Sequence, residues 1–239
     1  MNPVKNPNST QLRQENVFLN LVINILLPSL ILIKGIKWFS LSPSGALVCA
    51  IIFPICYGVF DFIIRKRYNL FSVIGFISIL ITGGIGLFKL DKDWIAIKEA
   101  AVPSLIGLAV LATTKTQKPL VRLFLYNKEI VDVVRVDLEL DKRGNRTAFE
   151  QLMEFCTFLL AASFFLSASL NYLLAKYLIR SESGTDAFNM ELGKMTFWSY
   201  PVILIPSMVV MSLVLWKLLS GIKALTGLNT EEIFRISRD

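Results

Sequence analysis

Histidine is absent from the 239 residues, and cysteine occurs three times. The lack of histidine excludes Ser-His-Asp and Cys-His nucleophilic pairs, histidine-ligated zinc and histidine general bases. Three cysteines make neither a disulfide framework nor a four-cysteine metal site. Cys49, Cys56 and Cys156 all stand in apolar surroundings, which is typical of small buried residues. We therefore expect no catalytic residue, no metal and no cofactor, and favour a protein that is not an enzyme.

Charged residues are also scarce, at 18%, whereas a typical globular domain has about 25%. Apolar residues make up 54% of the chain, and the mean hydropathy is +0.59. A soluble core of this size does not need so much apolar surface. The composition therefore indicates a polytopic membrane protein.

Apolar runs of about 20 residues, the length that crosses the hydrocarbon layer as a helix, occur six times. Continuous runs favour helices over barrel strands, which would alternate. We expect an all-α membrane protein with six transmembrane helices, forming a single integral membrane domain over residues 1–239. The predicted spans are 17–36, 45–64, 70–88, 94–114, 155–179 and 198–219.

Lysine and arginine are distributed unevenly between the two sides that these spans define. Seventeen lie on the side of both termini and of the segment at 115–154, against six on the other side. The positive-inside rule then places both termini in the cytoplasm. The net charge of +7 follows from this sidedness and favours anionic lipid headgroups as contacts. A soluble basic face with stacking aromatics is missing, so we expect no nucleic-acid partner.

The segment at 115–154 is the longest one outside the predicted spans. Its first part is apolar with two cations, Lys118 and Arg122, which are expected to reach lipid phosphates. Residues 130–141 are rich in valine and partly alternate, so that a strand and a short helix both stay open. Residues 147–154 are expected to begin the fifth helix.

Lys98 and Glu99 lie four and five residues inside the fourth predicted span, roughly 6–8 Å below its outer end. Charges at membrane depth usually face a bundle interior or a water-filled cavity. One interpretation is a polar site open to the outside. The other is that Lys98 extends to the interface and Glu99 is interfacial.

Small and hydroxyl residues form stripes on two other spans. Ser78, Thr82 and Gly86 share a face of the third span, and Ser163, Ser167 and Asn171 share a face of the fifth. Such stripes favour close packing of membrane helices, although both end near the depth of Lys98. The predicted substrate pocket comprises Lys98, Glu99, Asn171, Gly83, Gly84, Gly86 and Pro103.

A second group of polar residues lies near the inner ends of the first two spans. Asn20 and Asn24 share one helix face, and Asp61 stands four residues before Arg65. These four residues form a predicted inner polar cluster. Interhelical hydrogen bonds that hold the bundle together are the alternative interpretation.

A tetrapeptide, Pro-Ser-Leu-Ile, occurs at 28–31 and again at 103–106. These two positions lie in the first and fourth predicted spans, which run in opposite directions. A repeat of this kind is typical of transporters built from two inverted halves of three helices. Chance, combined with the tolerance of membrane helices for proline, is the alternative.

Three stretches together resemble a known family: residues 82–88 (Thr-Gly-Gly-Ile-Gly-Leu-Phe), 93–98 (Asp-Trp-Ile-Ala-Ile-Lys) and 118–122 (Lys-Pro-Leu-Val-Arg). In order and spacing they are similar to the bacterial inner-membrane family YciB, also called intracellular septation protein A. Residues 170–175 and 193–196 fit more loosely. The similarity covers most of residues 20–220, but the chain is longer at 127–150 and between its last two spans. In this it resembles a six-helix septation protein A-like branch, some members of which are automatically labelled transporters.

The resemblance implies a protein of the bacterial inner membrane that supports envelope integrity and membrane-lipid homeostasis, and it brings no catalytic residue. Our leading hypothesis is that the protein moves a lipid or a small amphiphile. A scaffold that recruits division or envelope-synthesis proteins is one alternative, and a small secondary transporter is another. The expected partners are membrane lipids and, for the scaffold, envelope-synthesis or division proteins.

Overall fold

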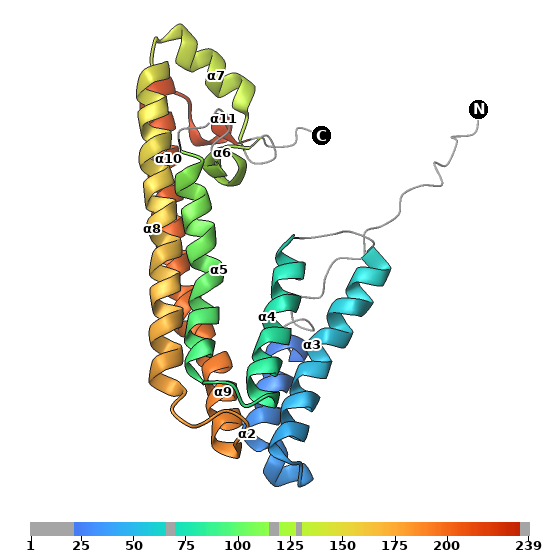
Figure 1. Ribbon diagram of the computed structural model, residues 1–239. Helices are drawn as coiled ribbons and strands as arrows, with labels where there is room; N and C mark the ends of the chain where they lie inside the picture. Colours follow the sequence, from blue (N-terminus) through green and yellow to red (C-terminus); the bar gives the residue numbers. More distant parts are fainter. Residues whose placement is uncertain (1–21, 66–69, 115–119, 128–130, 235–239) are drawn as a thin grey trace, which may run out of the picture.

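The computed structural model describes residues 22–65, 70–114, 120–127 and 131–234, and these fold into helices (Figure 1). The predicted all-α class is thus confirmed for the described residues. Among them, β-type backbone pairing is limited to an isolated bridge between Val131 and Phe234. The first elements are η1 (Val22–Leu26), α2 (Leu27–Phe39), α3 (Pro43–Arg65) and α4 (Leu70–Leu87). They are followed by α5 (Asp93–Ala112), α6 (Leu120–Leu125), α7 (Val133–Lys142), α8 (Arg146–Leu178), α9 (Asp186–Ser199), η2 (Tyr200–Leu204), α10 (Ile205–Thr226) and α11 (Thr230–Ile233).

Four helical segments are long and apolar enough to cross a membrane: Pro43–Phe60, Asp93–Ala112, Arg146–Leu178 and Asp186–Thr226. The predicted runs at 17–36 and 70–88 overlap two shorter apolar helices, Val22–Gly35 and Ile77–Leu87, within the described residues. By length and composition of its helices, the chain is a helical membrane protein.

The last predicted span begins too late. Residues 186–226 are continuously helical through α9, η2 and α10, whereas the run of apolar residues suggested a start at 198. Polar residues such as Asn189, Glu191 and Lys194 interrupt the apolar run in α9 without interrupting the helix. The hydroxyl of Thr185 caps the start by accepting a hydrogen bond from the Phe188 backbone N–H at 3.2 Å.

The long helices run in alternating directions (Figure 1). α8 packs antiparallel against both α5 and α10, and these three form one arm of the molecule. α2, α3 and α4 form the other arm, and α9 packs on α2. In the view of Figure 1 the two arms meet at the lower end and diverge upward.

Glycines allow close approach in both arms. A Cβ at Gly107 of α5 would lie 3.2 Å from the Cβ of Phe164 on α8. A Cβ at Gly193 of α9 would lie 2.9 Å from the carbonyl oxygen of Ser29 on α2. Because membrane helices associate largely through packing, small residues at such crossings let backbones come together.

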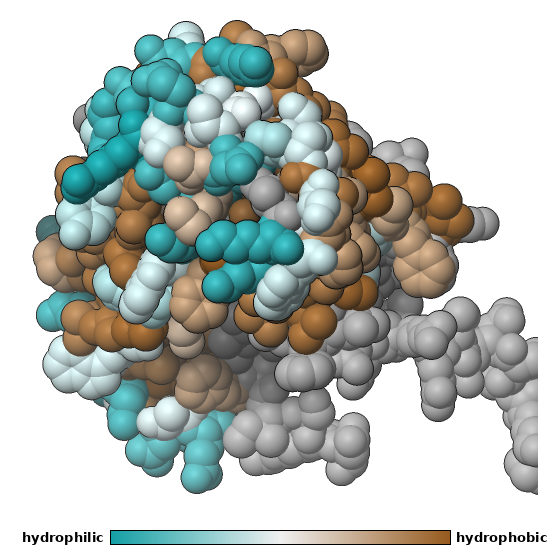
Figure 2. Space-filling view, turned by 90° about the horizontal axis from the view of Figure 1, so that it is seen from below, coloured by the Kyte–Doolittle hydropathy of each residue, from teal (hydrophilic) through white to brown (hydrophobic). Residues whose placement is uncertain are grey.

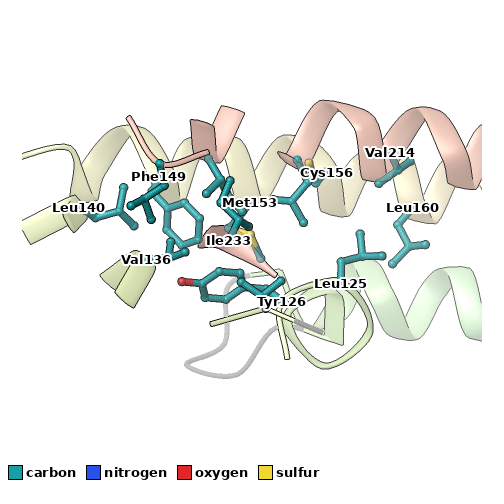
Figure 3. Close-up of a cluster of buried hydrophobic side chains, with 14 of the residues drawn as sticks. Leu125, Tyr126, Val136, Leu140, Phe149, Met153, Cys156, Leu160, Val214 and Ile233 are labelled. Atoms are coloured by element: carbon teal, nitrogen blue, oxygen red, sulfur yellow. The ribbon is translucent and has the colours of Figure 1, made fainter. Parts of the chain in front are cut away.

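The upper end of the first arm is closed by α6, α7 and α11. Val136 and Leu140 of α7, together with Tyr126 just after α6, are buried and pack on Phe149 and Met153 of α8 (Figure 3). The rings of Tyr126 and Phe149 lie 5.0 Å apart. Residues 133–142 form a helix, which decides between the strand and helix interpretations of this segment. An isolated strand would have left its backbone unpaired, whereas α7 satisfies its own and buries Val136 and Leu140 one turn apart.

The lower end joins the loops at 88–92 and 179–185. Lys92 Nζ lies 3.2 Å from Glu182 Oε1, and Lys176 Nζ lies 2.7 Å from Asp93 Oδ2. Figure 2, which views this end, shows hydrophilic residues across much of its surface and hydrophobic ones along its flank. The ion pairs connect the start of α5 and the residue before it to the end of α8 and the loop after it.

The two prolines of the repeated tetrapeptide, Pro28 and Pro103, have different surroundings, and Pro206, which also precedes a serine, resembles the first of them. Pro28 and Pro206 each stand in the first turn of an α-helix that follows a π-helical turn, while Pro103 lies inside α5. A proline lacks the N–H that would bond four residues back, so a wider turn before it is a common accommodation. The local geometry therefore pairs the first helix with the last, and the inverted repeat stays a prediction.

Candidate functional site

Lys98 projects from α5 toward α4 and is almost enclosed, with its side chain 10% exposed. Its ammonium nitrogen lies 2.7 Å from Thr82 Oγ1, 3.1 Å from Ser78 Oγ and 2.7 Å from Glu99 Oε1. An ammonium group has three N–H donors, and all three therefore have an acceptor. The charge at membrane depth is thus both paired and hydrogen-bonded, the arrangement that makes such a charge tolerable.

Ser78 and Thr82 were predicted as a packing stripe, and the structure adds them to the site as the acceptors for Lys98. They lie one turn apart on α4, and the Thr82 hydroxyl itself donates to the Ser78 carbonyl at 3.0 Å. The signal was present in the sequence. α4 and α5 are consecutive helices with a short connection, so residues at similar distances from that connection are brought to the same level.

Glu99 is more open than its neighbour, with its side chain 26% exposed. One carboxylate oxygen contacts Lys98. In the part of the chain that the structure describes, its other oxygen, Oε2, accepts no hydrogen bond. An ionised carboxylate has about four lone-pair sites, so Glu99 keeps acceptor capacity toward a group that approaches from outside.

The face of α5 that carries Lys98 is covered by α4 at the level of Lys98 but not further along. Leu105, seven residues later on the same face, is 64% exposed, and Trp94, four residues earlier, is 55% exposed. Seven residues of α-helix correspond to about 10 Å. Figure 1 shows the same arrangement, with α4 and α5 close at the lower end and apart above it. The Lys98–Glu99 pair therefore lies at the end of an uncovered apolar helix face.

Asn171 was predicted to share a pocket with Lys98 and Glu99, and the structure directs its amide N–H elsewhere. Its Nδ2 donates to the Ser167 carbonyl at 2.8 Å, one turn back on α8. The side of α5 that packs on α8 carries Gly107, whereas Lys98 faces α4. The Asn171 amide N–H therefore bonds within its own helix, and among the described residues no hydrogen bond joins Asn171 to Lys98 or Glu99.

The glycines of α4 pack against neighbouring helices. A Cβ at Gly83 would lie 2.7 Å from Ile51 Cδ1, and one at Gly86 would collide with Leu47 and lie 3.3 Å from Phe188. A Cβ at Gly84 would lie 3.9 Å from Phe88, which directly follows α4. These contacts agree with the packing interpretation of the stripe. Pro103 is half-buried inside α5, five residues beyond Lys98.

The inner polar cluster is only partly described. Asn24 lies half-buried in η1, and Asp61 and Arg65 both belong to α3, one turn apart as expected. Asn20 and the side chains of Asp61 and Arg65 lie outside the described residues, so the meeting of the four stays a prediction.

Of the two predicted headgroup cations, Lys118 lies outside the described residues. Arg122 of α6 is ion-paired with Glu150 of α8, with its side chain 30% exposed. A guanidinium already paired with a carboxylate is partly neutralised. The ion pair holds α6 against α8, and a headgroup contact at Arg122 stays a prediction.

An apolar hollow lies along α10, lined by Ile205, Met208, Val209, Ser212, Leu213 and Trp216. None of these residues belongs to α4 or α5. The hollow is lined by α10 residues, and Lys98 and Glu99 are not part of its lining. In the described residues no group of three or more metal-ligating side chains gathers.

Comparison with protein-family models, with curated proteins and with solved structures gave no match for this chain. The Lys98–Glu99 pair and the uncovered helix face beside it are therefore the structural features that bear on function.

Proposed function

We propose that this chain is a six-span protein of the bacterial inner membrane, with both termini cytoplasmic, that supports membrane-lipid and envelope homeostasis by holding and moving a lipid. The resemblance to the YciB, or septation protein A-like, proteins supports the setting. The uncovered apolar face of α5 supports the proposal that the substrate is a lipid.

One observation carries the proposal: a paired lysine and glutamate lie at the end of an exposed apolar helix face. In a bilayer that face is open to lipid from the side, because α4 leaves α5 beyond Lys98. An amphiphile needs both features, an apolar surface for its chain and a polar site for its headgroup. The pair lies about 7.5 Å along α5 from Asp93, a depth that a headgroup reaches from the near interface.

Leaflet exchange in reconstituted vesicles tests this function. The purified protein is placed in liposomes that contain a trace of lipid with a fluorescent headgroup, and exchange is followed by quenching the outer leaflet. We expect faster exchange than in protein-free vesicles. Leu105→Trp, which fills the uncovered face, should slow it toward the protein-free rate.

Leu173→Trp is the matched control, because Leu173 is an equally exposed leucine of α8, at 61% against 64% for Leu105. It should leave the rate unchanged. A wild-type rate equal to that of protein-free vesicles, or equal slowing by both substitutions, contradicts the proposal.

The scaffold is supported by a different observation. Val134 and Leu138, one turn apart on α7, are 64% and 55% exposed on the short helix that closes the upper end. Affinity capture from cross-linked membranes tests this function, with Val134→Ser and Leu138→Ser combined in one variant. A division or envelope-synthesis protein captured by wild type and lost with this variant would favour the scaffold.

A further inference from the structure

The Lys98–Glu99 pair has no net charge, and this limits what it attracts. An isolated lysine would favour an anionic headgroup, and an isolated glutamate a cationic one. Here the ammonium and carboxylate lie 2.7 Å apart, so that each neutralises the field of the other. A ligand with a single charge gains little from such a pair, whereas a ligand with both charges can match both.

The hydrogen bonds of the pair show where each ligand charge would go. Two of the three Lys98 donors are directed at neutral hydroxyls, Ser78 Oγ and Thr82 Oγ1. An anionic oxygen is a stronger acceptor than a hydroxyl and can replace one of them. Oε2 of Glu99 is an acceptor without a donor among the described residues. The arrangement thus takes one anionic oxygen at Lys98 and one N–H donor at Glu99.

The apolar face sets the direction of the rest of the ligand. From Lys98 the exposed surface of α5 continues through Leu105 and Leu108, which are 64% and 54% exposed, toward the middle of the helix. A lipid with its headgroup at the pair would lay its acyl chains along this surface. Leu105 is about 10 Å further along the helix than Lys98, which is within reach of an acyl chain, because one leaflet fills half of a hydrocarbon layer that is about 30 Å thick.

We propose that the Lys98–Glu99 pair selects zwitterionic phospholipids whose headgroup ammonium carries an N–H, such as the primary ammonium of phosphoethanolamine, with the phosphate at Lys98 and the ammonium N–H at Glu99 Oε2. This inference rests on the proposed function, because it names the lipid that the uncovered face would hold. It separates two zwitterionic headgroups: phosphoethanolamine has N–H donors for Glu99, whereas phosphocholine has none.

Native mass spectrometry of the purified protein with a series of lipids of identical acyl chains tests the inference. The series contains phosphatidylethanolamine, its N,N-dimethyl derivative, phosphatidylcholine and anionic phosphatidylglycerol. Loss of one charge-assisted hydrogen bond corresponds to about a tenfold loss of affinity. We expect the amount of lipid that stays bound to the protein to fall about tenfold from phosphatidylethanolamine to phosphatidylcholine. The dimethyl derivative keeps one N–H and should bind nearly as well as phosphatidylethanolamine.

Glu99→Gln should abolish the preference for the primary ammonium. Glu182→Gln is the matched control, since Glu182 also pairs with a lysine at this end of the molecule, 3.2 Å from Lys92, but outside α5. It should retain the preference. Soluble phosphoethanolamine should not compete at concentrations where the lipid binds, because it cannot use the Leu105 surface. Competition by it would overturn the assignment to a lipid.

The lipid series needs no variant, so the inference stays testable if Glu99→Gln does not fold. Equal retention of all four lipids, or preference for phosphatidylglycerol, overturns the headgroup inference. If leaflet exchange by wild type is intact in that case, the proposed function stands without it. Absence of leaflet exchange overturns the proposed function itself.

Discussion

Lys98 and Glu99 should be energetically coupled, and a double-mutant cycle measures the coupling. In the cycle Lys98→Met and Glu99→Gln are made singly and together. Lys98→Met leaves the carboxylate of Glu99 without its counter-charge at membrane depth. Removing one partner of a buried pair costs about 3–5 kcal/mol. Because the Glu99 side chain is 26% exposed and solvent or headgroups screen it, we expect the low end of this range, about 3 kcal/mol.

The double variant should be more stable than the sum of the single effects predicts. Methionine and glutamine together leave no charge, and two neutral hydroxyls remain on α4, where Thr82 can still donate to the Ser78 carbonyl. We expect a coupling free energy of about 1–3 kcal/mol between the two sites, as for residues in contact. Thr82→Val, which removes one neutral acceptor and keeps both charges, should cost about 1 kcal/mol.

Unfolding in detergent micelles, followed by circular dichroism as denaturant is added, gives the four free energies. Each variant needs the same slope for its midpoints to be compared. Additive single effects would refute the reasoning, because they would mean that Lys98 and Glu99 do not interact. A Thr82→Val effect as large as that of Lys98→Met would also refute it.

Three further predictions concern the fold. Gly193→Ala should lower the midpoint of thermal unfolding in micelles by several degrees, because its Cβ would lie 2.9 Å from a backbone carbonyl oxygen of α2 that cannot give way cheaply; an unchanged midpoint contradicts this crossing. Burial, and then the Asp137 carboxylate, raise the pKa of Tyr126 above its ordinary 10.0. The stabilisation that the neutral Tyr126 gives to the upper end is therefore complete below pH 10 and is lost as the pH rises further. In a pH series of unfolding midpoints, Tyr126→Phe should flatten this loss, and a pH dependence identical to that of wild type refutes the prediction. In a cysteine-free background, Glu182→Cys should react with an impermeant maleimide in intact spheroplasts and Gly144→Cys only after lysis; the reverse pattern contradicts the proposed topology.

Much of the helical architecture follows from hydropathy alone. The runs of apolar residues locate α3, α4 and α5 to within two residues of their ends. In an apolar setting the backbone must satisfy its own hydrogen bonds, so that Pro54 in α3 and Pro103 in α5 do not end their helices. α9 was missed because the polar residues of its first turns broke the run. The capping signal of Thr185 followed by Asp186 was available, and it identifies the start of the helix when hydropathy does not.

The sequence predicted how far along α5 the Lys98–Glu99 pair lies, but not which neighbouring helix the pair faces. The distance of Lys98 from the helix start is fixed by the sequence, and its nearness to Ser78 and Thr82 follows from the short connection between α4 and α5. The sequence does not fix which neighbouring helix packs on each side of α5. Asn171 lies on α8, which packs on another side of α5, and only the tertiary arrangement decides this.

The central claim is that a particular lipid resides on the uncovered face of α5, in contrast to the lipid that surrounds every membrane helix. A photoreactive phenylalanine at position 105, with position 173 as the reference, tests it most directly. After illumination in native membranes, the lipids attached at each position are identified by mass spectrometry. We predict that position 105 captures phospholipids enriched in primary-amine headgroups relative to the bulk membrane, while position 173 captures the bulk composition. Bulk composition at both positions would contradict the claim.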